Sequence, residues 1–321
     1  MIKPHKLVIL GLGHVGSAVL ARALSSRLFA EIVTVDILEN VSHGEALDAE
    51  HATPDRDFYG VRVRAGDYSD CADADVIVCA AGGSIGPGAS DRLALARQNI
   101  PAMRSLMAEV TRYTKDAVMI FITNPLDVVT YVAATEFDYR PGRLFGTGTS
   151  LETLRLKRVL ADRYAVNAVD VQGYVLGEHG NSGFTAFSTV AIGGVGAAAL
   201  DRVYGLSDTL DRKAVGERVV KVAYEVNNSK GWTNTGIATA AISLARAALM
   251  NEHAIYPVSM PLNGEYGLSH VALSLPSVIG ASGVEKRLLL DLTEDEVALL
   301  AQSAESVKVV LRENGVIGAN D

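Results

Sequence analysis

Long hydrophobic runs are missing from this 321-residue sequence, and cysteine is scarce. No apolar stretch reaches the roughly 18 residues that span a bilayer, and the opening MIKPHKLVIL meets a glycine too early for a secretory signal. Cys71 and Cys79 have no metal-ligand spacing and no secretory context. We therefore expect a cytoplasmic protein with reduced thiols and no membrane contact.

An excess of positive charge is also lacking, since 29 Lys and Arg residues face 37 Asp and Glu residues, for a net charge of −8. This balance argues against a nucleic-acid partner, although a local basic pocket could still bind a small anion. No cluster of His, Cys and carboxylate residues has ligand spacing, so no metal site is predicted. The length suggests two domains, and the 49% of apolar residues indicates a compact globular protein.

Short apolar runs alternate with helical patterns through the first half. Runs that are apolar on both alternating faces are typical of a parallel sheet covered on both sides, so we expect a Rossmann-type doubly wound α/β fold. One predicted helix, around 95–114, contains Pro101, where we expect a break or kink. The predicted strands are 6–10, 32–37, 61–65, 74–81 and 117–124.

The second half is organised differently. Helical stretches at 211–228 and 235–250 precede two strand-like runs around the turn dipeptide Asn263-Gly264, which predicts antiparallel pairing. Thr293 and Glu296 are spaced as a capping box at the start of a final helix. We expect an α+β second domain, with the division at 1–145 and 146–321.

A glycine-rich turn follows the first predicted strand. KLVILGLGHVGSA places Gly11, Gly13 and Gly16 as G-x-G-x-x-G between a strand and a helix, which favours binding of a dinucleotide pyrophosphate at the helix N-terminus. Asp36 ends the second strand, where a carboxylate suits a ribose diol and repels a 2′-phosphate, and Ile37 adds no positive charge. The pattern predicts NAD rather than NADP; a purely structural turn is the alternative.

A titratable pair interrupts the apolar run GYVLGEHGNSG at 173–183. Glu178 and His179 lie among glycines at the point where a buried strand should end. The plain interpretation is a polar turn, and the sharper one is an active-site imidazole, whose pKa near neutrality suits proton transfer.

Motifs in the same order and spacing over residues 7–311 resemble the L-lactate and malate dehydrogenase family, and the last three resemble its L-2-hydroxyisocaproate dehydrogenase branch most closely. The resemblance implies an NAD-dependent oxidoreductase acting on a small 2-hydroxy or 2-oxo acid, assembled as a homotetramer or homodimer. The segments are GLGHVGSA, TVDI, HGEALDAEHA, AAGG, TNPLDVVT, GTGTSLETLRLKR, GYVLGEHGNS and KGWTNTGIATAAISLA.

The resemblance assigns the catalytic histidine to His179 and its acidic partner to Glu152, where the family has an aspartate. A carboxylate there would orient the imidazole and raise its pKa. Arg155 matches the arginine that binds the substrate carboxylate through two parallel donors. Its alternative is a surface ion pair on a charged helix, but residues 152 and 155 are three apart and can share one side of that helix.

Further positions carry over with less specific patterns. Asn124 matches an asparagine that contacts substrate or cofactor, and the following Pro125 is a candidate for a cis peptide bond, with a plain strand-ending turn as the alternative. Thr233 matches a substrate-pocket threonine and Ile237 an apolar neighbour of the nicotinamide, although both could be ordinary core residues.

Glycines and a proline in the segment 83–91 predict a lid before a helix that begins near Arg92. Arg92 matches the family arginine that reaches the reacting carbonyl, and Ile85 falls at the substrate-selecting position. No positive charge occurs between 82 and 91 to balance a second carboxylate, so a monocarboxylic 2-oxo acid is predicted and malate dehydrogenase is the alternative.

Two further alternatives concern regulation and catalysis. Family members activated by fructose 1,6-bisphosphate use an arginine and a histidine at the positions of Lys157 and Gln172, so we expect no such activation. A non-catalytic NAD-binding module should have lost His179 or Arg155, yet both remain.

Overall fold

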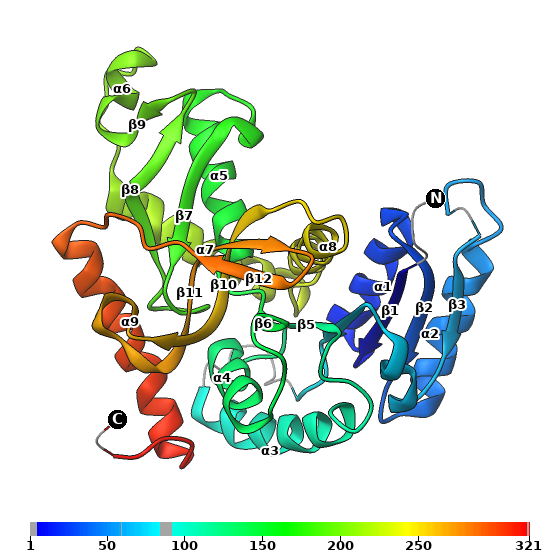
Figure 1. Cartoon of the computed structure of the whole chain (residues 1–321). Coiled ribbons are helices and arrows are strands. Elements are labelled where there is room, and N and C mark those ends of the chain that lie inside the picture. The colour runs from blue at the N-terminus through cyan, green and yellow to red at the C-terminus, as the bar shows by residue number, and fades with distance from the viewer. Residues whose placement is uncertain (1–4, 59, 84–91, 320) are drawn as a thin grey trace.

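The computed structural model describes residues 5–58, 60–83, 92–319 and 321. These residues form a nine-stranded sheet of order β12-β11-β10-β6-β5-β4-β1-β2-β3. A smaller sheet of order β7-β8-β9 lies at the upper left in Figure 1.

The first half forms the parallel part of the large sheet. Each pair β3-β2, β2-β1, β1-β4, β4-β5 and β5-β6 is parallel, which confirms the predicted Rossmann-type order. The strands are β1 (His5–Leu10), β2 (Phe29–Val35), β3 (Arg62–Ala65), β4 (Val76–Cys79), β5 (Val118–Phe121) and β6 (Leu144–Gly146). The helices are α1 (His14–Ser26), α2 (Glu39–Ala52), α3 (Arg92–Val110) and α4 (Leu126–Glu136).

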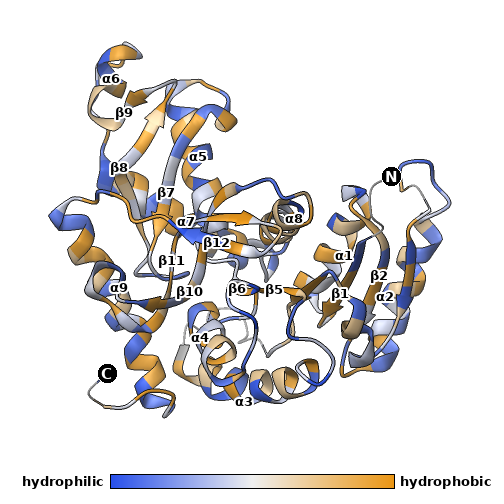
Figure 2. Ribbon diagram, in the orientation of Figure 1, coloured by the Kyte–Doolittle hydropathy of each residue, from blue (hydrophilic) through white to orange (hydrophobic). Residues whose placement is uncertain are grey.

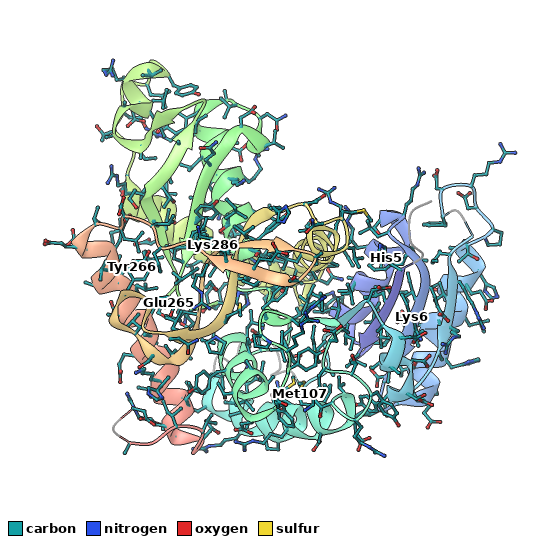
Figure 3. The ribbon with its side chains drawn as sticks, in the orientation of Figure 1. His5, Lys6, Met107, Glu265, Tyr266 and Lys286 are labelled. Atoms are coloured by element: carbon teal, nitrogen blue, oxygen red, sulfur yellow. The ribbon has the colours of Figure 1, made fainter. Side chains whose placement is uncertain are left out.

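Alternate residues of β1 enter two different cores, which explains why the strand is apolar from Leu7 to Leu10. Leu7 and Ile9 belong to a cluster that includes buried residues of α1 and α8. Val8 and Leu10 face the opposite cluster, which includes Met107 of α3 (Figure 3) and residues of α4. Strands β1 and β5 are accordingly drawn in hydrophobic colours in Figure 2. Coverage on both faces fixes the sheet as a rigid platform.

Of the break or kink predicted at Pro101, the break is wrong, because α3 continues through that residue from Arg92 to Val110. Proline has no N–H, so one intrahelical hydrogen bond is lost at this point. Ile100 and Met103 on either side are buried in separate apolar clusters. Packing on both sides holds the helix together where local propensity alone would end it.

The second half contributes a second sheet and an extension of the first. The small sheet is antiparallel and contains β7 (Val171–Leu176), β8 (Phe184–Ile192) and β9 (Val195–Gly196). The helices are α5 (Ser150–Tyr164), α6 (Leu200–Val203), α7 (Arg212–Lys230), α8 (Thr235–Leu249) and α9 (Glu294–Glu313). The predicted capping box of Thr293 and Glu296 begins α9.

The predicted antiparallel pair around Asn263-Gly264 is confirmed as β10 (Ala254–Asn263) and β11 (Ser269–Gly280), joined by residues 264–268. Strand β12 (Gly283–Arg287) adds to β11. Sequence patterns did not indicate that this meander joins the parallel sheet, which it does where Ser259 of β10 pairs with Gly146 of β6. This junction brings second-half residues to the carboxyl ends of the parallel strands, the edge where α/β folds bind ligands.

Candidate active site

The glycine turn between β1 and α1 needs its glycines for different reasons. Gly11 has φ of 91°, and a Cβ there would lie 2.5 Å from the backbone of Ala81. A Cβ on Gly16 would lie 1.9 Å from the carbonyl oxygen of Gly11. Gly13 caps α1 without a side chain, and a Cβ on it would meet nothing within 4 Å. Two glycines therefore close the turn, and the third leaves open space beside the unpaired amides of the helix N-terminus.

Asp36 lies beside this turn, as predicted. It follows the last residue of β2, and its carboxylate accepts hydrogen bonds from the amides of Leu12 at 2.7 Å and Leu38 at 2.9 Å. The glycine turn and the acidic residue thus come from adjacent strands to one place. This arrangement fits a dinucleotide with free ribose hydroxyls.

His179 and Glu152 are brought together from distant parts of the chain. His179 follows β7 after a short loop, and Glu152 lies in the first turn of α5. Nδ1 of His179 is 3.0 Å from Oε1 of Glu152, which makes an ion pair that lacks the alignment of a hydrogen bond. The longer glutamate therefore reaches the imidazole that the family's aspartate would contact, and it leaves Nε2 on the far side of the ring.

Arg155 shares the same side of α5, as the spacing predicted. Its Nη1 atom lies 3.6 Å from the Oε1 atom of Glu152 that faces His179, and its side chain is only 13% exposed. A surface ion pair on a charged helix is thereby excluded, because the guanidinium lies beside a buried carboxylate and the imidazole. One negative charge lies between two positive groups, an arrangement suited to receiving an anionic substrate.

The ionisation of the pair reflects this geometry. Burial alone would lower the pKa of His179, but the interaction with Glu152 and the negative charge of Asp127 together outweigh burial and raise that pKa above its ordinary value. Burial would likewise raise the pKa of Glu152, but the positive charges of His179 and Arg155 hold it below its usual range. The imidazolium form therefore persists to higher pH than in an ordinary histidine, which suits a proton donor.

Three consecutive amides fix the loop that carries His179. The amide of Gly177 donates to the Ser274 carbonyl at 3.1 Å, and Ser274 returns the bond at 2.9 Å. The amide of Glu178 donates to Ser303 Oγ at 2.7 Å, and the amide of His179 donates to Asp127 Oδ2 at 2.7 Å. Sequence patterns missed these acceptors. The one indication in the sequence is that Asp127 follows Pro125 by two residues, in the strand-ending segment TNPLD.

Asn124 lies at the carboxyl edge of the sheet, just beyond β5, and it is exposed. The Asn124–Pro125 peptide bond is cis, as the resemblance implied. The Asn124 carbonyl accepts a hydrogen bond from Asn99 Nδ2 at 2.6 Å, and Asn99 also binds Gly83 N–H at 2.8 Å. Asn99, buried on α3 and missed by the sequence patterns, thus joins two strand-end segments of the site.

The turn before α8 approaches the glycine turn. Thr233 is half-buried in this turn, and Ile237 is 6% exposed on α8. Next to Thr233, the Trp232 ring stacks on His14 of α1 with ring centroids 3.8 Å apart. The predicted substrate-side turn therefore contacts the first residue of the predicted cofactor helix.

Two predicted site residues are outside this description. Ile85 and most of the 83–91 segment lie outside the described residues, and so does the side chain of Arg92, whose backbone begins α3. Their assignments stay predictions.

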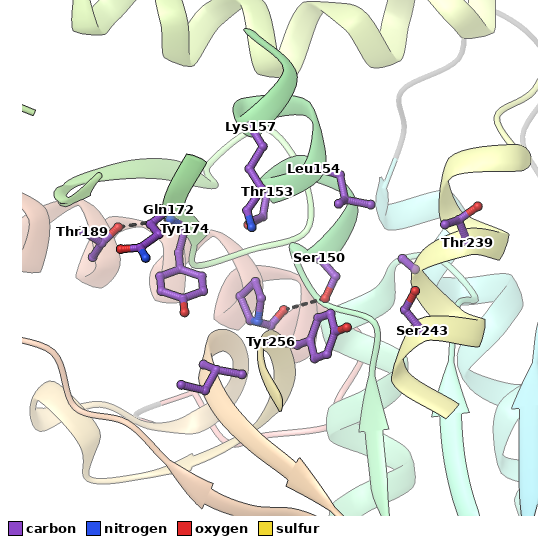
Figure 4. Close-up of a pocket in the computed structure, with 14 residues that line it drawn as sticks. Ser150, Thr153, Leu154, Lys157, Gln172, Tyr174, Thr189, Thr239, Ser243 and Tyr256 are labelled. Carbon is purple, nitrogen blue, oxygen red and sulfur yellow. Dashed lines mark hydrogen bonds between the residues drawn. The ribbon is translucent and has the colours of Figure 1, made fainter. Parts of the chain in front are cut away.

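A pocket of about 540 Å³ lies between α5, α8, β7 and β10 (Figure 4). Its lining includes Lys157 and Gln172, the two positions that the resemblance relates to sugar-bisphosphate binding, together with Tyr174 and Tyr256. Burial lowers the pKa of Lys157. Because His179 is not among the lining residues, this pocket is separate from the Glu152–His179 pair.

Among the described residues, no group of three or more His, Cys, Asp or Glu residues could hold a metal ion. Within the same residues, every helix is too short or too polar to cross a membrane.

Comparison with known proteins links both halves of the chain to one family. Residues 5–146 match the family model described as the lactate/malate dehydrogenase NAD binding domain. Residues 149–315 match the model of the lactate/malate dehydrogenase alpha/beta C-terminal domain.

Similar proteins cover almost the whole chain. The L-lactate dehydrogenase of Selenomonas ruminantium is 45% identical over 313 residues, which are 97% of this chain and 98% of that protein. L-lactate dehydrogenase 2 of Clostridium acetobutylicum is 44% identical over 309 residues, 96% of this chain and 97% of the other. The solved structure of a minor L-lactate dehydrogenase from Enterococcus mundtii matches with a TM-score of 0.90 at 32% identity, covering 97% of this chain and 98% of its own.

Proposed function

The chain belongs to the lactate/malate dehydrogenase family, and from this premise we propose that it reduces a monocarboxylic 2-oxo acid with His179 as the proton donor. The family membership makes it an NAD-dependent oxidoreductase acting on the CH–OH group of a 2-hydroxy acid. The observation that carries the proposed mechanism is the Arg155–Glu152–His179 arrangement around a single carboxylate oxygen.

The chemistry is divided between cofactor and chain. NADH, when bound, supplies the hydride. Since Nδ1 of His179 faces Glu152, the proton for the carbonyl oxygen comes from Nε2. Glu152 stabilises the imidazolium before transfer, and Arg155 binds the substrate carboxylate and fixes its orientation. In the direction of oxidation, neutral His179 takes the proton back.

The same division suggests roles for the two halves. We assign residues 1–145 to the cofactor, with Gly11, Gly13, Gly16 and Asp36 holding the dinucleotide. Residues 146–321 supply the catalytic pair and the substrate arginine. Asn124, Thr233 and Ile237 would line the junction between the two, which the stacking of Trp232 on His14 supports.

The substrate follows from charge and similarity. The segment 82–91 contains no lysine or arginine to balance a second carboxylate, which favours a monocarboxylic acid over oxaloacetate. The 45% and 44% identical relatives named L-lactate dehydrogenase favour pyruvate as substrate. A branched 2-oxo acid, the L-2-hydroxyisocaproate type, is the second candidate because Ile85 and the surrounding glycines predict an apolar pocket. Ile85→Arg should raise activity on oxaloacetate; no gain would show that this position does not face the substrate.

The catalytic role is tested by His179→Asn, with His43→Asn on the exposed face of α2 as the matched control. We expect His179→Asn to lose 2-oxo acid reduction by about 100-fold or more while NADH binding, followed by fluorescence titration, stays unchanged. The control should keep both properties. An active His179→Asn variant would contradict the proposal, and an inactive parent that binds NADH would favour the non-catalytic module.

Assembly and location are further proposals. We infer a homotetramer or homodimer from the family, which light scattering on purified protein measures directly; a monomer would refute it. We also infer a cytoplasmic location, which the free and buried state of Cys71 and Cys79 supports.

A further inference from the structure

Asp127 is a buried acid that the proposed mechanism does not use. It lies in the first turn of α4, two residues after the cis Asn124–Pro125 bond, and is 2% exposed. A carboxyl group is rarely buried so completely without a specific role, because removing its charge from water is costly. Its contacts indicate that role.

Both carboxylate oxygens of Asp127 have partners in the structure. Oδ2 accepts the amide hydrogen of His179 at 2.7 Å, and Oδ1 accepts the hydroxyl hydrogen of Ser259 at 2.6 Å. Ser259 is fully buried at the junction of β10 with β6. The side chain therefore ties the proposed catalytic residue to the rigid centre of the large sheet (Figure 1).

The other two anchors of the loop are uncharged. Gly177 is held by the backbone of β11, and Glu178 by the hydroxyl of Ser303 on α9. Only the anchor at His179 itself can carry a negative charge, and the imidazole gains a proton in the form that the reaction needs. One side chain can thus fix the position of the loop and stabilise the charge of the ring.

We propose that Asp127 is a positioning residue for His179, which holds the backbone of the loop through the His179 amide and supports the protonated imidazole with its negative charge. This inference rests on the proposed function. The TNPLD segment then has two roles, because Asn124 contacts substrate or cofactor and Asp127 supports proton transfer by His179.

The electrostatics agree with this geometry. Burial raises the pKa of Asp127 to about 7, although the hydrogen bond from Ser259 acts to lower that pKa. Among the described residues, the other charged groups that act on Asp127 and His179 are Glu152 and Arg155 from α5 and Glu178 from the loop. As the pH rises through neutrality, Asp127 ionises and stabilises the imidazolium, so His179 keeps its proton to higher pH.

Asp127→Asn separates position from charge. The amide has the same shape, its oxygen can accept the His179 amide hydrogen, and its nitrogen can donate to Ser259. We expect the pH at which reduction falls to move down by about half a pH unit or more, and the pH at which oxidation rises to move down equally. A loss of structure alone would lower both rates without moving either profile.

Two serine variants provide a graded test. Ser259→Ala removes a hydrogen bond that stabilises the ionised carboxylate, so the profiles should move in the same direction by less. The matched control is Ser277→Ala, because Ser277 is equally buried on β11 but its hydroxyl donates to the nearby Leu275 carbonyl instead of to a carboxylate. The control should leave both profiles in place.

The experiment measures kcat/KM against pH in both directions for the parent and these variants, with an NMR titration of the His179 imidazole alongside. Coinciding profiles and an unchanged imidazole titration in Asp127→Asn would overturn the role of Asp127. Absence of 2-oxo acid reduction in the parent would instead overturn the proposed function. In that case the imidazole titration still decides about Asp127, with a lowered His179 pKa as the expected result.

Discussion

The carboxylate of Glu152 should determine the pH at which His179 loses its proton, and Glu152→Gln removes that charge with little change in shape. At the observed 3.0 Å, an effective dielectric constant of about 20 gives an attraction of about 5 kcal/mol. Arg155 lies 3.6 Å from the same oxygen and competes for it, and the lost pairing is partly replaced by an amide dipole. A decrease of about 1 to 3 in the pKa of His179 follows, equivalent to about 1.4 to 4 kcal/mol.

The sign of the effect on activity depends on direction. Reduction requires the imidazolium, so the parent is active below the raised pKa of His179 and loses activity above it. Lowering that pKa moves the loss to lower pH, and at a pH above both pKa values reduction should fall by about 10-fold to 1,000-fold. Oxidation, which requires neutral imidazole, should instead become active at lower pH.

The assay is the initial rate of NADH oxidation with a saturating 2-oxo acid across the pH range, with Asp162→Asn as the control. Asp162 lies on the same helix α5 but forms an exposed ion pair with Arg158. Glu152→Asp, which restores the charge on a shorter side chain, should recover part of the parent profile. A Glu152→Gln profile that superimposes on that of the parent would refute the assignment of Glu152 as the partner of His179.

Three other predictions concern ligands. Gly16→Ala should lower Tm, because its Cβ would lie 1.9 Å from the carbonyl oxygen of Gly11, whereas Gly13→Ala should fold normally and raise the Kd for NADH, since its Cβ enters open space. Thermal melts with and without NADH distinguish the loss of stability expected for Gly16→Ala from the weaker NADH binding expected for Gly13→Ala. Equal losses of Tm in the two variants would contradict these separate roles. Asp36→Ser should weaken NADH binding and relieve the exclusion of NADPH, measured as the ratio of kcat/KM values; an unchanged ratio would mean that Asp36 does not face the ribose. Fructose 1,6-bisphosphate should leave the rate unchanged despite the pocket lined by Lys157, and a saturable activation curve would disprove this.

The parallel half of the fold could be predicted from the sequence because its determinants are local. From Leu7 to Leu10, strand β1 is apolar at every position because alternate residues enter two cores, and this pattern is visible in the sequence. The glycine turn and Asp36 follow from the same local order. Pro101 misled the prediction because the packing of Ile100 and Met103, which maintains α3, is a tertiary effect.

The catalytic pair could be located only in part. Spacing along α5 predicted that Glu152 and Arg155 share a face, and the resemblance supplied the link to His179. The acceptors of the loop amides come from residues 52 to 125 positions away in sequence, so no local pattern indicates them. The pairing of Ser259 with Gly146 is equally non-local, and it is what brings β10 beneath the site.

The most direct test of the central claim is the initial rate of NADH oxidation with pyruvate, 2-oxoisocaproate, phenylpyruvate and oxaloacetate, with NADPH in parallel. The account predicts that a monocarboxylic acid gives the highest kcat/KM, with NADH preferred over NADPH. If oxaloacetate gave the highest kcat/KM, the account of the substrate would be contradicted, because a basic residue outside 82–91 would then have to bind the second carboxylate. No reduction of any of the four acids would contradict the assignment of His179 and Arg155 as working catalytic groups.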